Sequence, residues 1–472
     1  MRFTLIHGTN QARPMFHKKR FGFSQVPVYP PLGVLYLGSM LEQAGYDAEI
    51  IDFFIDKDPY ASIDNSIHQS DVIGLSVDNV SSEEASQLAQ YIKNKDSDIP
   101  VVIGGPYCSL YQERALMKIS AADVSVDGDG EHTIVNIAKA FEGTQHLSDI
   151  SGVFYRKNSS VAHGKPPEPI RNLDVIPFPA RHLVAKYEYG KSSKLFMNKP
   201  RLTSLATARG CPFRCKYCHY SSVWRPFFRQ RSVENVMTEF HEIIEQGYQS
   251  VMFANPVFLA HQKRAHAILD ELIAMGSPLE LFLGGNRTDI TDRTLYEKMR
   301  KAGVKYISFG LVSGNQDTIE FSGKHLTVEQ TRKIVCLCNE LGFFINGSFY
   351  LGAPFEDKNH FKNTIEFACS LPLDTVVFNP LAYNYESDLW KEAYTQGKIH
   401  NDAYQTFADK ELGLSPFTRN EISMYCRWGL RRFFYRPQYL THLFTKALKT
   451  DDSRWIHSVI NELMLSSGLR KN

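Results

Sequence analysis

The feature that most limits the fold is a repeated alternation of short apolar runs with amphipathic helical stretches. In residues 1–150 the runs RFTLIHG, DAEIIDFF, DVIGLSV, IPVVIGG and ADVSVDGDG are nearly continuous in apolar character, as strands covered on both faces are. Between them lie GVLYLGSMLEQAG, EEASQLAQYIKN and HTIVNIAKAFEG, which carry apolar residues at helical spacing. This order predicts an α/β domain with a doubly wound, Rossmann-like parallel sheet, whose ligand binds at the carboxyl ends of the strands.

A second alternating series begins near residue 201. Six strand-like runs, LTSLATARG, SVMFANP, LELFLGGN, YISFGLVSG, FFINGSFYLGAP and TVVFNPLA, are separated by helical stretches. Six successive βα units predict a (β/α)6 partial TIM barrel over residues 201–390. Residues 151–200, where prolines interrupt the periodicity, are expected to be a connector, and residues 391–472 a helical C-terminal region.

Composition narrows the class of protein. A chain of 472 residues has room for two or three domains. It has no apolar run near the roughly 18 residues of a membrane span, and its first residues do not resemble a signal peptide. We therefore expect a cytoplasmic protein with no membrane span. The net charge of +2 gives no reason to expect nucleic acid as a partner.

Three cysteines are crowded into the stretch RGCPFRCKYCHY, directly after the first strand of the second series. Cys211, Cys215 and Cys218 are spaced C-x3-C-x2-C. A structural zinc site needs four ligands, and His219 could complete it, but adjacent Cys218 and His219 rarely both reach one tetrahedral ion. A [4Fe-4S] cluster held by three cysteines leaves one iron open to a small chelating molecule. The spacing therefore favours a catalytic iron-sulfur cluster.

This loop resembles the cysteine motif of the radical S-adenosylmethionine (SAM) superfamily, including the aromatic Tyr217 before the last cysteine. The resemblance implies that the three thiolates hold the cluster and that SAM binds its open iron. One electron from the cluster would then cleave SAM to a 5′-deoxyadenosyl radical.

Segments at later strand ends, FANPVF, GGNRTDIT, SFGLVSGNQDTIEFSGK and NGSFYLGAPFED, resemble SAM-contacting segments of the same superfamily. The resemblance implies that Tyr217 lies against the adenine and Gly352 under it, and that Asn255 lies near the methionine amino group. It implies that Arg287 and Ser313 lie near the carboxylate or ribose. The chain departs from many relatives at Val312, where they carry a glutamate, so a carboxylate contact there is missing or comes from elsewhere.

The first 150 residues resemble the cobalamin-binding domain that precedes the barrel in many radical SAM enzymes. The similar segments include YPPLGVLYLGSMLEQAGYDAEIIDF, DVIGLSVDN, VVIGGPYCS and VDGDGEHT. Small residues at strand ends would let a bulky nucleotide tail pass between strand and helix, although such residues also occur in the tight turns of any doubly wound sheet. The residues expected to bind cobalamin are Ser76, Val77, Gly104, Gly105, Pro106, Tyr107, Gly128, Gly130 and Glu131.

Enzymes with this pair of domains mostly methylate unactivated carbon or phosphorus. The resemblance implies that methylcobalamin supplies the methyl group to a small-molecule substrate after the deoxyadenosyl radical removes a hydrogen atom. We therefore expect a cobalamin-dependent radical SAM methyltransferase; a cyclase or rearranging enzyme without methyl transfer is the alternative. The expected substrate is a natural-product or cofactor intermediate, and the expected electron donor is a flavodoxin or ferredoxin. The sequence nominates no acid-base pair as catalytic residues.

Two other classes explain less of the sequence. A tRNA-modifying methylthiotransferase would suit the basic, aromatic stretch that follows the cysteines, but it carries additional cluster cysteines in its N-terminal domain. Only Cys108 is available there. A cobalamin sensor without enzymatic activity would leave the cysteine loop without a role.

Overall fold

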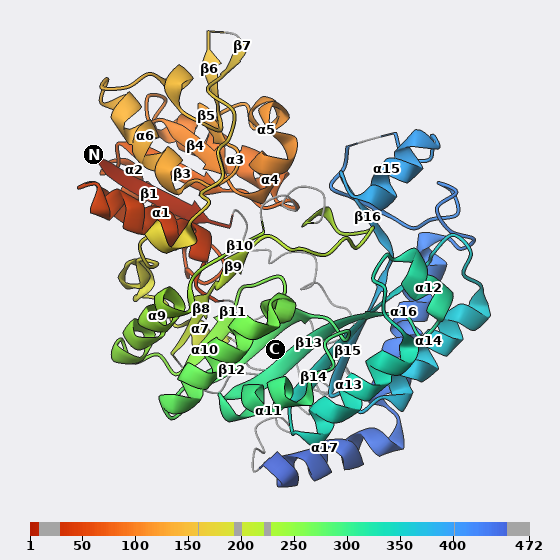
Figure 1. Ribbon diagram of the computed structural model, residues 1–472. Coiled ribbons are helices and arrows are strands. Elements are labelled where there is room, and N and C mark those ends of the chain that lie inside the picture. Colours follow the sequence, from red (N-terminus) through yellow and green to blue (C-terminus); the bar gives the residue numbers. More distant parts are fainter. Residues whose placement is uncertain (9–28, 159, 193–200, 221–227, 401, 451–472) are drawn as a thin grey trace. The chain divides into compact units, whose positions relative to one another are not determined.

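The computed structural model describes residues 1–8, 29–158, 160–192, 201–220, 228–400 and 402–450 (Figure 1). The described chain divides into two compact units, one formed by residues up to Ser192 and the other by residues from 201 onward. The boundary expected at residue 150 thus falls inside the first unit, as does most of the region expected to be a connector.

The first unit is built on a seven-stranded sheet in the order β2-β1-β3-β4-β5-β6-β7. The first five strands in chain order are parallel, and β6 and β7 form an antiparallel hairpin on the edge beside β5. Their bounds are β1 (Arg2–His7), β2 (Asp47–Asp52), β3 (Val72–Ser76), β4 (Val101–Gly104), β5 (Val124–Val126), β6 (Val153–Lys157) and β7 (Ser160–His163). The strand order reverses between β1 and β3, which is where doubly wound sheets open a ligand crevice.

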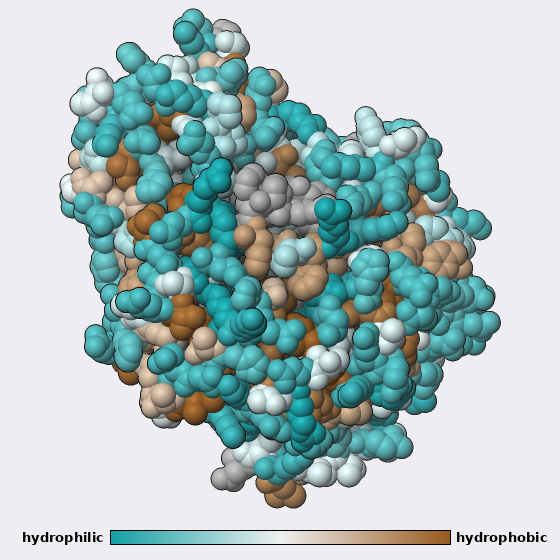
Figure 2. Space-filling model, viewed as in Figure 1, coloured by the Kyte–Doolittle hydropathy of each residue, from teal (hydrophilic) through white to brown (hydrophobic). Residues whose placement is uncertain are grey.

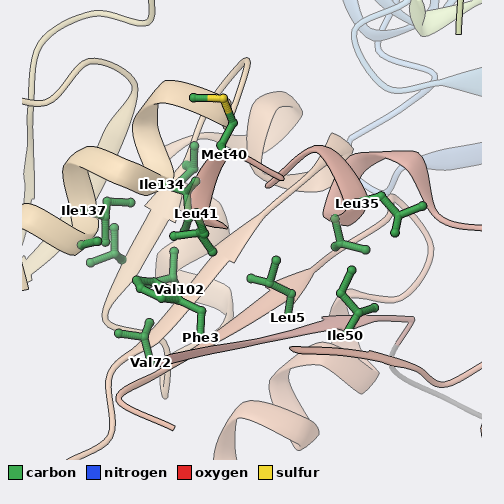
Figure 3. Close-up of a cluster of buried hydrophobic side chains, with 14 of the residues drawn as sticks. Phe3, Leu5, Leu35, Met40, Leu41, Ile50, Val72, Val102, Ile134 and Ile137 are labelled. Carbon is green, nitrogen blue, oxygen red and sulfur yellow. The ribbon is translucent and has the colours of Figure 1, made fainter. Parts of the chain in front are cut away.

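Helices cover this sheet, and its core lies under two of them. They are α1 (Leu32–Gln43), α2 (Pro59–Ile67), α3 (Ser82–Lys95), α4 (Pro106–Tyr111), α5 (Glu113–Lys118), α6 (Glu131–Phe141) and α7 (Tyr189–Ser192). Figure 3 shows Leu35 and Leu41 of α1 and Ile134 of α6 directed at strand residues such as Phe3 and Val102. All five are at least 96% buried, so the apolar stripes of α1 and α6 supply the packing that holds this face.

The second unit is an open barrel of six parallel strands in the order β15-β14-β13-β12-β11-β8. Their bounds are β8 (Leu202–Leu205), β11 (Ser250–Phe253), β12 (Glu280–Asn286), β13 (Val304–Val312), β14 (Phe344–Leu351) and β15 (Thr375–Pro380). Each strand pairs with its neighbour in the sequence, as a barrel of βα units requires. Together with the first unit, this confirms the predicted fold class.

Helices and two short antiparallel ribbons complete the second unit. The helices are α9 (Val233–Glu245), α10 (Gln262–Ala274), α11 (Arg293–Lys301), α12 (Gln316–Phe321), α13 (Val328–Glu340), α14 (Lys358–Ser370), α15 (Asp388–Thr395), α16 (Arg419–Phe434) and α17 (Pro437–Thr450). The ribbons pair β9 (Ala208–Arg209) with β10 (Arg229–Gln230) and β16 (Ala382–Asn384) with β17 (Gln405–Phe407). Capping boxes, in which an N-cap side chain and the third helical residue exchange hydrogen bonds, start α13, α14 and α16.

The outer faces of the barrel helices are mostly polar. In Figure 2 the surface over α13 and α14 is largely hydrophilic, whereas hydrophobic atoms show at the lower edge of the view, where α17 lies in Figure 1. Leu440, Phe444 and Leu448, spaced by one helical turn, are exposed on α17. No helix within the described residues is both long and apolar enough to cross a membrane.

Candidate functional site

The cysteine loop follows β8 and β9, and its backbone is tied to three other parts of the second unit. The Lys216 amide donates to the Ser322 carbonyl (3.0 Å), one residue beyond α12, and the Leu389 amide of α15 donates to the Lys216 carbonyl (2.9 Å). The side-chain amide of Asn384, on β16, donates to the Tyr217 carbonyl (2.6 Å). These contacts attach the backbone of the loop to the segment after α12, to α15 and to β16.

The three thiols of the loop form a donor set suited to an iron-sulfur cluster. All eight cysteines lie in the described part of the chain, and none of them forms a disulfide; Cys215 is buried, while Cys211 and Cys218 are partly exposed. Among the described residues, no three His, Cys, Asp or Glu side chains meet closely enough to hold one metal ion. A cubane does not require such convergence, because each thiolate binds a different iron.

Two buried cations lie beside the loop. Arg287 follows β12 and Lys324 follows α12, and each is 5% exposed. One guanidinium nitrogen of Arg287 lies 3.8 Å from the Cys215 sulfur, and the guanidinium carbon lies 4.0 Å from the centroid of the Phe213 ring. Burial raises the pKa of the Cys211 thiol, whereas the charges of Arg287 and Lys324 act to lower it. The cations therefore favour the thiolate form, which is the form that binds iron.

Tyr217 lines an apolar pocket next to the loop. Its ring centroid lies 5.0 Å from that of Tyr350 in an edge-to-face arrangement, and both rings pack against the apolar cluster of Val312, Ile319 and Leu326. Leu381 and Leu389 also line the pocket. Val312 has a φ of +72°, a conformation that β-branched residues rarely adopt. An apolar wall thus stands at the strand end where the resemblance to the radical SAM superfamily implied a carboxylate.

Gly352, at the end of β14, is held by a buried carboxylate that the sequence did not reveal. Glu356 is 1% exposed and accepts hydrogen bonds from the amides of Gly352 (2.7 Å) and Ala353 (2.9 Å) and from the Thr318 hydroxyl (2.9 Å). Gly352 has a φ of +110°, and a Cβ there would lie 2.7 Å from a methyl carbon of Ile422. Glycine is therefore required at this turn. In the sequence, these hydrogen bonds to Glu356 are indicated only by a glutamate four residues after a glycine at a strand end.

Asn255 and Ser313, expected near SAM, use their side chains in hydrogen bonds within the protein. The Asn255 side chain accepts from the Thr207 amide (2.9 Å) and donates to the Thr207 hydroxyl (2.9 Å). The Ser313 hydroxyl lies 2.8 Å from the Thr364 hydroxyl of α14. In this arrangement both residues position the loops that carry the expected SAM contacts.

Thr207 is a second positioning residue that the sequence did not reveal. It is fully buried, and its carbonyl accepts from the Arg264 guanidinium (2.8 Å) and the Arg231 amide (3.1 Å). Arg231, part of the basic stretch that could have suited RNA, is buried against Glu239 instead of facing solvent. No local pattern marks these residues, because their contacts join segments far apart in the chain.

In the first unit, the residues expected to bind cobalamin gather at the carboxyl ends of β3, β4 and β5. The Val77 amide donates to the Gly104 carbonyl (2.8 Å), and the Tyr107 amide donates to the Val77 carbonyl (3.2 Å). Ser76 ends β3 and Gly105 and Pro106 follow β4. Gly128 lies in the loop after β5, and Gly130 and Glu131 begin α6. The structure therefore brings all nine residues to one edge of the sheet.

Two neighbouring glycines at this edge differ in what they permit. Gly105 has a φ of +105°, and a Cβ there would lie 2.9 Å from the Val77 carbonyl oxygen, so the backbone itself requires glycine. A Cβ at Gly104 would meet nothing closer than the Val126 Cβ at 3.7 Å. A Cβ can therefore be added at Gly104 without a steric clash, whereas at Gly105 it cannot.

Comparison with known proteins agrees with both sites. The model of the B12 binding domain matches residues 24–138, and that of the radical SAM superfamily matches residues 205–368. The chain is a cobalamin-binding radical SAM enzyme. Its cofactors are accordingly a [4Fe-4S] cluster, SAM and cobalamin.

Individual relatives extend the similarity over both units. The chain is 28% identical to the uncharacterized methyltransferase PH0819 of Pyrococcus horikoshii, over 87% of this chain and 89% of that protein. It is 25% identical to the anaerobic magnesium-protoporphyrin IX monomethyl ester cyclase of Rubrivivax gelatinosus, over 89% of this chain and 76% of that one. The structure of the methyltransferase TsrM from Kitasatospora setae, with cobalamin and a [4Fe-4S] cluster bound, matches the fold with a TM-score of 0.67 at 18% identity, covering 84% of this chain and 78% of that one.

Proposed function

We propose that this enzyme is a cobalamin-dependent methyltransferase that methylates an unactivated carbon or phosphorus centre of a small molecule. The observation that carries the proposal is the similarity to the P. horikoshii protein named as a methyltransferase, which extends through both units. Cytidylyl-2-hydroxyethylphosphonate methyltransferase of Streptomyces wedmorensis is also similar, at 24% identity over 78% of each chain.

The proposed roles of the protein's own residues follow from the site. Cys211, Cys215 and Cys218 bind three irons of the cluster, and Arg287 and Lys324 stabilise the thiolates. The glycine-lined edge at β3, β4 and β5 accepts cobalamin, which supplies the methyl group when bound. The chain's share of catalysis is to position the reactants and to exclude water and oxygen, so no acid-base pair is needed.

A cyclase without methyl transfer is the second candidate. The R. gelatinosus protein named as a cyclase is similar over 89% of this chain, compared with 87% for the methyltransferase relative, although the match covers less of the cyclase itself (76% against 89%). Both candidates require a small-molecule substrate and an electron donor, and we propose a flavodoxin or ferredoxin for the latter.

A measurement without substrate separates the two candidates. Anaerobically reduced enzyme loaded with cobalamin is mixed with SAM, and S-adenosylhomocysteine is quantified. A methyltransferase must reload its methyl carrier from SAM, so we expect about one S-adenosylhomocysteine per bound cobalamin. A wild-type enzyme that binds cobalamin but forms no S-adenosylhomocysteine would favour the cyclase.

The substitution Gly104→Leu provides the matched control. A leucine at the end of β4 should fill the space proposed for the nucleotide tail and abolish both cobalamin binding and S-adenosylhomocysteine formation. Ser97→Leu adds the same side chain at an exposed site before the other end of β4. It should leave both unchanged, and cobalamin binding by Gly104→Leu at the wild-type level would contradict the proposed site.

A further inference from the structure

Lys324 is an unusual lysine, because its ammonium is buried beside the cysteine loop. It is 5% exposed and donates a hydrogen bond to the Gly310 carbonyl of β13. A Cβ at Gly310 would lie 2.8 Å from the Lys324 ammonium nitrogen, so a side chain at that strand position would force the ammonium to shift. Keeping a lysine charged in such a place costs free energy unless a negative charge lies near.

The segment that carries Lys324 packs directly on the cysteine loop. Ser322 accepts a hydrogen bond from the Lys216 amide, and a Cβ at Gly323 would lie 3.1 Å from the Arg214 carbonyl oxygen. The Lys324 carbonyl accepts from the Arg287 guanidinium. Lys324 and Arg287 therefore form one unit beside the thiols.

The charges of this unit do not balance within the protein. Asp289 accepts two hydrogen bonds from Arg287 (2.8 and 2.9 Å) and so pairs with one of the two cations. Of the described carboxylates, none lies within ion-pairing distance of Lys324. Burial lowers the pKa of Lys324 to about 8; the Cys215 thiolate acts to raise it, the charge of Arg287 to lower it, and the Asp289 carboxylate to raise it. Arg287, Lys324 and Asp289 together therefore carry one net positive charge beside the cysteine loop.

We propose that Lys324 sets the reduction potential of the cluster as a buried, uncompensated positive charge. Adding an electron makes the cluster more negative, and a nearby cation in a poorly hydrated site stabilises the reduced form more than the oxidised form. Lys324 is thus a positioning and charge-setting residue that makes electron transfer to the cluster easier. The inference rests on the three cysteines as cluster ligands, but not on methyl transfer.

The test is a redox titration of reconstituted protein without substrate, followed by electron paramagnetic resonance of the reduced cluster. Lys324→Gln removes the charge and keeps a hydrogen-bond donor, and we expect reduction to become at least about tenfold less favourable, a shift of 59 mV to lower potential. Lys324→Arg keeps the charge and should retain the wild-type potential. Asp289→Asn should raise the potential, because it leaves both cations uncompensated.

Lys216→Gln is the matched control. Lys216 lies inside the cysteine loop, but its ammonium is exposed and pairs with Glu392 at 3.3 Å, so solvent screens its charge. Removal of the Lys216 charge should leave the reduction potential of the cluster unchanged.

A wild-type potential in Lys324→Gln, or a potential in Lys324→Arg as low as in Lys324→Gln, would overturn the inference. If Lys324→Gln binds no cluster, Lys324→Arg decides alone, and a potential there well below the wild-type value would overturn the inference. If the wild-type protein itself binds no cluster, the result would contradict the assignment of the three cysteines as cluster ligands and not the role of Lys324.

Discussion

Replacement of Cys211, Cys215 and Cys218 by alanine is expected to abolish the cluster completely. The three residues are the proposed source of every protein ligand to the irons, and the loop contains no other cysteine that could replace them. Iron and acid-labile sulfide measured after anaerobic reconstitution should fall from a full cluster in the wild type to background, and cleavage of SAM to 5′-deoxyadenosine should disappear.

The same analysis on a variant outside the loop gives the control. Cys336 is exposed on α13, and its replacement by alanine should leave the iron and sulfide content unchanged. Cobalamin binding should survive in the triple variant, since the proposed cobalamin residues lie in the other unit. A triple variant that keeps a normal cluster would show that the ligands have been misassigned.

Substitution of Lys446 by alanine is expected to have the largest effect on stability. Lys446, on α17, pairs with Asp374, whose side chain is fully buried before β15. His442 binds the other carboxylate oxygen at 3.1 Å, and the Ile345 amide donates at 2.7 Å. Removing the ammonium leaves a buried carboxylate without its main countercharge, so we expect a loss of about 3–5 kcal/mol in the free energy of unfolding. Chemical denaturation followed by circular dichroism measures it.

The pH dependence of this effect has a definite sign. Burial alone would raise the pKa of Asp374, but Lys446 and His442 outweigh burial and hold the pKa below its ordinary value. A lowered pKa means that the pair stabilises the fold above the ordinary carboxyl range and that this stabilisation is lost as the pH falls through the folded-state pKa. In Lys446→Ala the acid-sensitive step should therefore shrink.

Two further variants separate charge from packing. The double substitution Asp374→Leu and Lys446→Met removes both charges and should recover most of the lost stability, because an apolar pair avoids desolvation. Arg293→Ala breaks an exposed ion pair with Glu340 and should change stability little. A cost for Lys446→Ala as small as that for Arg293→Ala would contradict the account of how α17 is attached.

The alternation of strands and helices carried most of the information about the fold. Most residues of β1 to β5 are buried, so their apolar runs could be recognised from the sequence alone. The hairpin of β6 and β7 was not anticipated. Its residues are partly exposed at the edge of the sheet, and an exposed edge strand lacks the continuous apolar run that marks a buried one.

The candidate site was predictable only where its chemistry lies in one short segment. The spacing of Cys211, Cys215 and Cys218 could be recognised because all three proposed ligands lie within one short loop of the sequence. Lys324 and Glu356 could not be recognised. Their roles depend on burial beside segments far away in the sequence, and a lysine or glutamate in isolation indicates a solvated surface. Asn255 was expected to contact SAM, but its side chain forms hydrogen bonds with Thr207. These bonds depend on the pairing of β8 with β11, which the sequence around Asn255 does not reveal.

The most direct test of the proposed function is the ratio of the two products made from SAM during turnover with the enzyme's substrate. A cobalamin-dependent methyltransferase consumes one SAM to activate the substrate and another to reload the methyl group. We therefore predict that 5′-deoxyadenosine and S-adenosylhomocysteine accumulate in equal amounts with the methylated product. Turnover that gives product and 5′-deoxyadenosine without S-adenosylhomocysteine would contradict the methyltransferase assignment and establish the cyclase or rearrangement alternative.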